Sequence, residues 1–105
     1  MKVINKILDN VLYISLEGEL DEASAEFTRS NLDACLDNSH AKQIVIDLAK
    51  LSFMDSTGIG MLIGRYKKMK TKGVPIFISN PSSHADRIFK MTGLYEIMPK
   101  VERRA

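Results

Sequence analysis

Residues 43–70 have the sequence QIVIDLAKLSFMDSTGIGMLIGRYKKMK, in which the pattern of a buried strand leads into the pattern of a helix. The β-branched run at residues 43–48 is typical of a strand in the middle of a sheet. Apolar residues then recur at helical spacing until Gly73 and Pro75 end the pattern. This stretch therefore predicts a central strand and a helix over residues 56–72.

The chain before this stretch predicts a hairpin and another helix. Two apolar runs, residues 3–8 and 11–16, flank Asp9-Asn10, a pair that tolerates the positive φ of a tight turn. Asp21 can then cap the free amides of a helix whose apolar positions continue to Leu36. One face of that helix should be buried.

The chain after this stretch predicts a strand, a third helix and an edge segment. Residues 74–79 have a strand pattern, and Asn80-Pro81 is a strong helix start because asparagine caps and proline leaves no amide unsatisfied. The helix should continue to about Thr92. We expect residues 94–98 to return as an edge segment and residues 100–105 to form a loose tail.

The order of these elements, ββαβαβα, is typical of an α/β fold. Strands joined through a helix imply a right-handed crossover, so we expect a mixed sheet of four to five strands with helices packed against it. A typical domain has about 100–200 residues, so residues 1–105 should form a single domain. Function in such sheets gathers beyond the carboxyl ends of the strands, where the connection at residues 48–58 lies.

The composition argues against several classes of function. A net charge of +2, from 15 basic and 13 acidic side chains, creates no field that would favour a nucleic acid. Cys35 is the only cysteine, which excludes an internal disulfide and a thiolate metal cluster and fits a reducing compartment. No apolar run has the length of a membrane span or a signal peptide. We therefore expect a cytoplasmic chain without metal, cofactor, membrane contact or direct nucleic acid contact.

The turn before the second helix places hydroxyl groups at a helix N-terminus. Asp55, Ser56 and Thr57 precede a first helical turn that contains Gly58 and Gly60. A phosphate on Ser56 would gain about 0.3–1 kcal/mol from the helix dipole, besides hydrogen bonds from free amides. The glycines would keep the surface low. The ordinary explanation of such a turn is that Asp55 or Ser56 caps the helix, so local chemistry alone does not decide its role.

Four segments together resemble the STAS family of anti-sigma factor antagonists, and most of all the sporulation antagonists of spore-forming bacteria. They are residues 53–60 (FMDSTGIG), residues 64–67 (GRYK), residues 91–94 (MTGL) and the earlier step at residues 18–21 (GELD). The resemblance covers nearly the whole chain, and it implies a single STAS-like domain.

The resemblance also implies a mechanism. In that family, the serine matching Ser56 is phosphorylated by an anti-sigma factor that is also a protein kinase. The unmodified antagonist binds this kinase so that sigma factor is released, and a separate serine phosphatase resets the antagonist. The chain itself would be no enzyme, and the free chain is expected to be a monomer. The expected partner-binding residues are Asp55, Ser56, Thr57, Gly58 and Gly60, with Asp21 and Asn80 on the same rim.

Other motifs in the sequence give weaker indications of function. The glycines in residues 58–64 have the wrong spacing for a dinucleotide fingerprint, and Met54 stands where a hydrolase elbow has glycine. His40 and His84, which look like turn or helix-start residues, are the only candidate bases. The basic residues of 65–72 form a solvated helix end or touch an acidic partner. A constitutive STAS scaffold or sensor subunit, in which Ser56 only starts the helix, stays the alternative function.

The sequence departs from the family pattern in two places. Pro99 is followed by a short charged tail, which leaves little room for a final packed helix, and Thr57 replaces the commoner serine.

Overall fold

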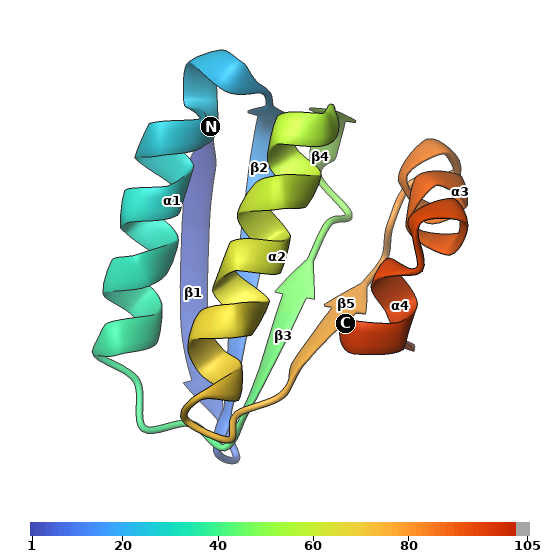
Figure 1. Ribbon diagram of the computed structural model, residues 1–105. Coiled ribbons are helices and arrows are strands. Elements are labelled where there is room, and N and C mark those ends of the chain that lie inside the picture. Colours follow the sequence, from blue (N-terminus) through green and yellow to red (C-terminus); the bar gives the residue numbers. More distant parts are fainter. Residues whose placement is uncertain (103–105) are drawn as a thin grey trace.

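The structure is a computed structural model, and it describes residues 1–102. In chain order its elements are β1 (Lys2–Leu8), β2 (Val11–Leu20), α1 (Glu22–Asp37), β3 (Gln43–Asp47), β4 (Leu51–Met54), α2 (Ser56–Lys70), β5 (Ile76–Ser79), α3 (Ser83–Thr92), α4 (Leu94–Ile97) and β6 (Lys100–Val101). The predicted α/β fold with a mixed sheet is confirmed. Helices α1 and α2 lie against one face of the sheet, and α3 and α4 lie beyond β5 (Figure 1).

The sheet is built around β2, which is long enough to pair with two strands, β3 and β4, on the same side. The strand order is β1-β2-β3-β5-β6, and only the β1–β2 pair is antiparallel. Residues 11–15 of β2 pair with β3, and residues 18–20 pair with β4, with a register shift between Gly18, whose φ is +116°, and Glu19. The C-terminal end of β2 therefore pairs with β4 beyond the end of β3.

Strand β4 corrects the expectation that residues 48–58 form only a connection. It has four residues, of which Leu51 and Met54 are buried and the two between them are exposed. Such a short segment has no recognisable strand period. Its pairing with β2 makes it a strand, and it fixes the point at which α2 begins.

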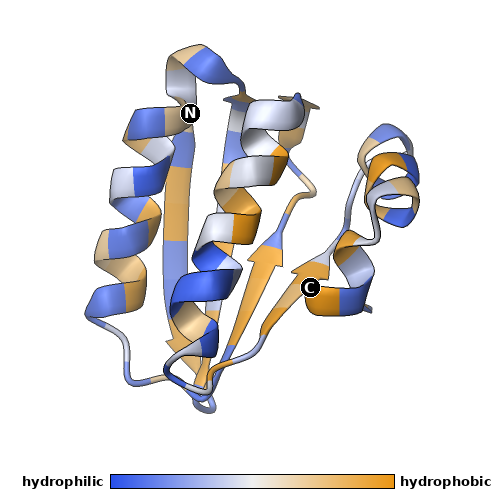
Figure 2. Ribbon diagram, viewed as in Figure 1, coloured by the Kyte–Doolittle hydropathy of each residue, from blue (hydrophilic) through white to orange (hydrophobic). Residues whose placement is uncertain are grey.

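The core lies between the sheet and the two long helices. Alternate residues of the central strands face the helices and are buried; they are Leu12, Ile14, Leu16, Ile44, Ile46, Ile76 and Ile78. Leu32 and Leu36 of α1 and Leu62 of α2 close this layer from above. Figure 2 shows apolar residues along the central strands and polar residues on the outer sides of the helices. The expected burial of one face of the first helix, α1, is confirmed.

Two local turn predictions have opposite outcomes. The hairpin turn is confirmed, since Asp9 and Asn10 have φ values of 52° and 64°. The prediction that Asn80 caps the third helix is wrong. Asn80 has φ of 53°, outside the extended region usual for a cap, and Ser82 caps α3 by accepting a hydrogen bond from the Ala85 amide at 3.1 Å.

The end of the chain also differs from the expectation. Residues 94–98 were expected to form an edge segment, but Leu94–Ile97 is a short helix, α4, because Gly93 with φ of 75° ends α3 and lets a new turn begin at once. The edge strand is instead β6, within the segment expected to be a loose tail. The remainder of that expected tail, residues 103–105, lies outside the described residues.

Asp86 joins the three C-terminal elements through one carboxylate. Its Oδ1 accepts hydrogen bonds from the Tyr95 hydroxyl at 2.6 Å and from Lys100 Nζ at 3.0 Å, and its Oδ2 pairs with Lys90 Nζ at 3.1 Å. The hydrogen bond from Tyr95, followed by those from the two lysines, holds the pKa of Asp86 well below its usual range. Asp86 therefore stabilises the packing of α3 and α4 on β6 in its charged form.

The Asp86→Asn substitution should change how stability depends on pH. A carboxyl with a lowered folded-state pKa stabilises the fold above its unfolded pKa of about 3.9, and this contribution is lost as the pH falls toward the folded value. We expect the variant to be less stable at neutral pH and to lose less stability on acidification, as measured by urea unfolding over a pH series. Glu96→Gln on α4 is the control, and an unchanged pH slope for Asp86→Asn would contradict the role of this carboxylate.

Candidate functional site

The ends of β2 and β4 place two helix starts side by side. Leu20 is paired with Met54, and the Asp55 amide donates to the Leu20 carbonyl at 3.3 Å. Asp21 and Asp55 follow these paired residues directly, and each is the N-cap of its helix. The structure thus brings Asp21 close to the turn that contains Ser56.

Each of these two aspartates satisfies the free amides of its own helix. Asp21 Oδ1 accepts from the Ser24 amide at 3.0 Å, and Ser24 Oγ accepts in return from the Asp21 amide at 3.1 Å. Asp55 Oδ1 accepts from the amides of Thr57 at 3.0 Å and Gly58 at 3.3 Å. The cap of α2 is therefore Asp55, and the helix does not need the hydroxyl of Ser56 to begin.

Ser56 is the first residue of α2, and its side chain is exposed. Within residues 1–102 its hydroxyl forms no hydrogen bond. Thr57 is exposed beside it, and its hydroxyl is likewise without a partner in the described chain. The turn therefore presents two unengaged hydroxyls on the surface, next to the carboxylate of Asp55.

The cap changes what a phosphate on Ser56 would meet. The sequence suggested that free helix amides would bind it, but the amides of Thr57 and Gly58 already donate to Asp55. A phosphate would keep the weak attraction of the helix dipole and would lie beside a carboxylate. The geometry thus indicates that a phosphate on Ser56 would be repelled by the neighbouring carboxylate and would not be held by hydrogen bonds from the helix amides.

The two glycines of the first turn have different roles. A Cβ on Gly58 would lie 2.6 Å from Met54 Cγ and 2.9 Å from Leu20 Cγ, so this buried glycine lets α2 pack closely on β2 and β4. A Cβ on Gly60 would meet nothing within 4 Å, and Gly60 is exposed. Both glycines were expected to keep the surface low; Gly60 lies on the surface, whereas Gly58 is buried and serves the packing of α2.

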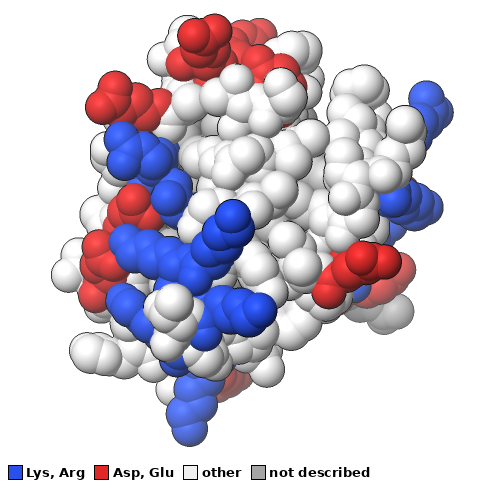
Figure 3. Space-filling view, in the orientation of Figure 1, with Lys and Arg blue, Asp and Glu red and all other residues white. Residues whose placement is uncertain are grey.

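A groove of about 510 Å³ runs between α1 and α2 from the Ser56 turn. It is lined by Glu22, Ala25, Glu26, Arg29, Thr57, Gly60, Met61 and Arg65. Acidic side chains gather over the start of α1, at the top of Figure 3, and basic ones gather over the last turns of α2. The acidic residues Asp21, Glu22 and Asp55 thus lie at the two helix starts beside Ser56, while Arg29 and Arg65 line the groove together with Glu22 and Glu26.

Part of the basic cluster of α2 has a structural role. Arg65 Nε lies 3.0 Å from Asp33 Oδ1, and Lys68 Nζ lies 3.3 Å from Asp33 Oδ1 and 2.8 Å from Asp37 Oδ1. Lys72 adds a longer pair of 3.7 Å with Asp37. The hydrogen bond from Lys68 lowers the pKa of Asp37. These ion pairs join α2 to α1, and sequence reasoning missed them because they depend on the two helices being neighbours.

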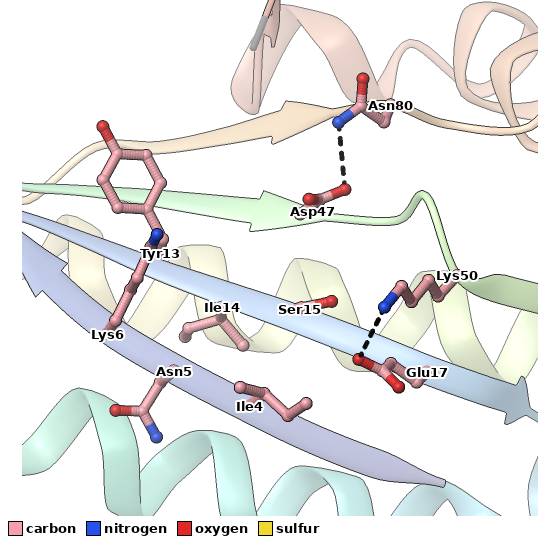
Figure 4. A pocket seen from close by; sticks show the side chains of 10 residues that line it. All are labelled: Ile4, Asn5, Lys6, Tyr13, Ile14, Ser15, Glu17, Asp47, Lys50 and Asn80. Carbon is pink, nitrogen blue, oxygen red and sulfur yellow. Dashed lines mark hydrogen bonds and ion pairs between the residues drawn. The ribbon is translucent and has the colours of Figure 1, made fainter. Parts of the chain in front are cut away.

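Asn80 contacts Asp47 and not the residues of the Ser56 turn. Its Nδ2 donates to Asp47 Oδ1 at 3.2 Å, and both residues line a groove of about 410 Å³ on the sheet face opposite α1 and α2 (Figure 4). Among the described residues Asn80 makes no hydrogen bond to Asp21 or Asp55. The structure thus brings Asp21 to the predicted site and places Asn80 on another face.

The described residues contain neither a metal-binding cluster nor a membrane-spanning helix. In residues 1–102, no group of three or more His, Cys, Asp and Glu side chains is arranged to hold a metal ion. Over that part of the chain, no helix combines the length and the apolar character that crossing a membrane requires.

Comparison with known proteins identifies one family over most of the chain. The STAS domain model matches residues 2–104. The anti-sigma F factor antagonist of Paenibacillus polymyxa is 36% identical over 89 residues, which are 85% of this chain and 76% of that protein. The anti-sigma-B factor antagonist of Bacillus subtilis (strain 168) is 32% identical over 90 residues, 86% of this chain and 81% of that protein.

Solved structures of one anti-sigma factor antagonist, SpoIIAA, have the same fold. Its unphosphorylated form superposes with a TM-score of 0.80 at 25% identity, over 98% of this chain and 89% of that chain. The phosphorylated form of the Bacillus cell fate determinant SpoIIAA superposes with a TM-score of 0.74 at 25% identity, over 98% and 92% of the two chains.

Proposed function

The chain belongs to the STAS domain family of anti-sigma factor antagonists, and we propose that it is a phosphorylation switch whose acceptor is Ser56. The unphosphorylated chain binds an anti-sigma factor that is also a protein kinase, and sigma factor is released. Phosphorylation of Ser56 by that kinase ends the binding, and a serine phosphatase restores it. The chain acts in the cytoplasm and catalyses no step itself.

The observation that carries this proposal is that Asp55, and not Ser56, caps α2. Asp55 caps α2, so the Ser56 hydroxyl is exposed and makes no contact that the fold needs. A kinase can therefore modify Ser56 without unfolding the turn. That SpoIIAA exists in unphosphorylated and phosphorylated forms with this fold supports the same conclusion.

The electrostatics of the site explain how one phosphate would end the binding. Phosphorylation adds about 1.5 to 2 negative charges. They would appear beside Asp55 and close to Asp21 and Glu22, the acidic residues at the two helix starts. A kinase that docks here presents basic groups to these acidic residues, and the added charge and bulk at Ser56 disrupt the fitted contact. Binding fails locally, while α2 and its cap stay folded.

Incubation with the kinase tests the proposal directly. The chain is mixed with the kinase anti-sigma factor of its source organism and ATP, and the phosphate is located by peptide mass. We expect one phosphate on Ser56, complete loss of labelling in Ser56→Ala, and undiminished labelling in the matched control Thr57→Ala. Labelling of Ser56→Ala at the wild-type level, or phosphate on another residue, would overturn the assignment.

A further inference from the structure

Arg65 is a largely buried cation whose hydrogen-bond donors are unused. Its side chain is 12% exposed, and its Nε lies 3.0 Å from Asp33 Oδ1 on α1. Within residues 1–102, however, neither Nε nor Nη1 of Arg65 makes a hydrogen bond, although both atoms are buried. Burying a charge costs free energy unless the charge is both paired and hydrogen-bonded. The ion pair with Asp33 therefore leaves Arg65 incompletely satisfied.

The ion-pair cluster around Arg65 contains more cations than carboxylates among the described residues. Asp33 is shared between Arg65 and Lys68. Asp37 is shared between Lys68 and Lys72. The two lysine side chains are 29% and 49% exposed, so water offsets part of their charge, and Figure 3 shows basic side chains over the last turns of α2. The positive charge that no carboxylate balances is therefore least offset at Arg65.

The groove between α1 and α2 extends from the Ser56 turn to Arg65. Thr57 and Arg65 both line it, about two turns apart on α2, which is about 12 Å along the helix. Two small residues of the lining, Ala25 and Gly60, leave space between these ends, since even a Cβ on Gly60 would meet nothing within 4 Å. A partner that covers Ser56 can therefore insert a side chain that reaches Arg65.

The other charges of the groove limit what can bind Arg65. Glu22 and Glu26 line the same groove, and Arg29 lies 3.7 Å from Glu26, which offsets the charge of Arg29. A phosphorylated side chain carries about 1.5 to 2 negative charges, so these glutamates would repel it more strongly than a single carboxylate. A carboxylate also accepts strong, charge-assisted hydrogen bonds from a guanidinium. The groove therefore fits an aspartate or glutamate side chain.

On the premise of the proposed function, we propose that Arg65 binds one acidic side chain of the kinase anti-sigma factor and so sets the orientation of the kinase along α2. Basic groups of the kinase face Asp21, Glu22 and Asp55 at the helix starts. An aspartate or glutamate of the kinase enters the groove and accepts a hydrogen bond from Arg65. A kinase turned end for end would place like charges together at both ends of the groove, which disfavours that orientation.

Affinity measurements separate this contact from a purely structural role of Arg65. Loss of one partner of a desolvated charge pair weakens binding by about 10-fold or more, so we expect that loss for Arg65→Gln when the kinase is titrated by calorimetry. Lys68→Gln is the matched control, because Lys68 joins the same two helices through Asp33 and Asp37 but does not line the groove. It should keep the affinity of the unmodified chain, and urea unfolding of both variants measures any change in stability.

Two results would overturn this contact and leave the Ser56 switch in place. Equal affinity of Arg65→Gln and the unmodified chain would show that no group of the kinase binds Arg65. An equal loss in Lys68→Gln would show that the ion pairs between α1 and α2 account for the effect. Saturating kinase should still label Ser56 in both variants, which distinguishes these results from a failure of the switch. An unmodified chain that neither binds the kinase nor is labelled would refute the switch and this contact together.

Carbodiimide coupling tests the chemistry of the partner group. The reagent joins carboxylates to amines and does not couple arginine, so position 65 can react only in Arg65→Lys. We expect a coupled peptide that joins position 65 to an aspartate or glutamate of the kinase. Replacement of that kinase residue by its amide should weaken binding to the unmodified chain and add no further loss to Arg65→Gln. Coupling of position 65 to Asp33 alone, or additive losses of affinity, would overturn the contact.

Discussion

Ser56→Asp should weaken binding to the kinase anti-sigma factor by roughly 30-fold or more, whereas Ser56→Ala should keep the wild-type affinity. An unpaired charge that is desolvated at an interface costs about 2–5 kcal/mol, and about 2 kcal/mol corresponds to that factor. The new carboxylate would lie next to Asp55, whose Oδ1 already accepts hydrogen bonds from the Thr57 and Gly58 amides, so these amides do not offset the new charge. The alanine variant adds no charge and less bulk, and α2 keeps its cap.

Titration of the kinase with each variant, by calorimetry or surface plasmon resonance, measures this difference in affinity. Ser83→Asp is the matched control, because Ser83 is also an exposed first residue of a helix, α3, behind a cap at Ser82. It introduces the same charge at the same helical position away from the site. If Ser56→Asp and Ser56→Ala bind equally well, charge at this turn does not control the partner. If Ser83→Asp weakens binding as much, the effect does not belong to the Ser56 turn.

The parts of the fold that could be predicted are those set by local chemistry. The hairpin at Asp9-Asn10 needs two residues that tolerate positive φ, and the cap at Asp21 needs a short acceptor before an apolar helical pattern. The central strand is a run of β-branched residues, which favour strands over helices and turns. Each signal lies within a few residues of the structure that it specifies.

The parts that could not be predicted depend on contacts distant in sequence. Strand β4 forms because β2 extends beyond β3 and offers it a pairing partner. The sequence of β4, four residues of mixed polarity, does not predict this pairing. Asn80 satisfies the rule for a helix cap, yet its side chain binds Asp47 instead, and Ser82 takes the cap. Residues 100–101 look like a polar tail, but β5 offers them a free edge.

The candidate site shows the same division. The sequence located the Ser56 turn and the hydroxyls on it. It left open whether Asp55 or Ser56 caps the helix, because both side chains can accept an amide hydrogen bond. It also treated Gly58 and Gly60 alike, since nothing within the turn distinguishes a glycine that faces the core from one that faces solvent. That distinction needs the positions of Leu20 and Met54, and it has a measurable consequence.

Gly58→Val should destabilise the fold by at least about 2 kcal/mol, because extra carbon atoms in a well-packed core cost about 1–3 kcal/mol and occasionally more. A Cβ on Gly58 would already lie 2.6 Å from Met54 Cγ and 2.9 Å from Leu20 Cγ, and both of those side chains are buried. Relief would require α2 to move away from the ends of β2 and β4. The movement would also displace the Ser56 turn, so the affinity for the kinase should fall with the stability.

Gly60→Val is the control for this prediction, on the same helix and with the same change of side chain. Its Cβ would meet nothing within 4 Å, and valine has a slightly higher helix propensity than glycine, so the free energy of unfolding should change by less than about 0.5 kcal/mol. Urea denaturation of both variants measures the difference. Equal stabilities would mean that α2 can shift on the sheet without cost. The Ser56 turn would then owe its position to the hydrogen bonds of Asp55 alone.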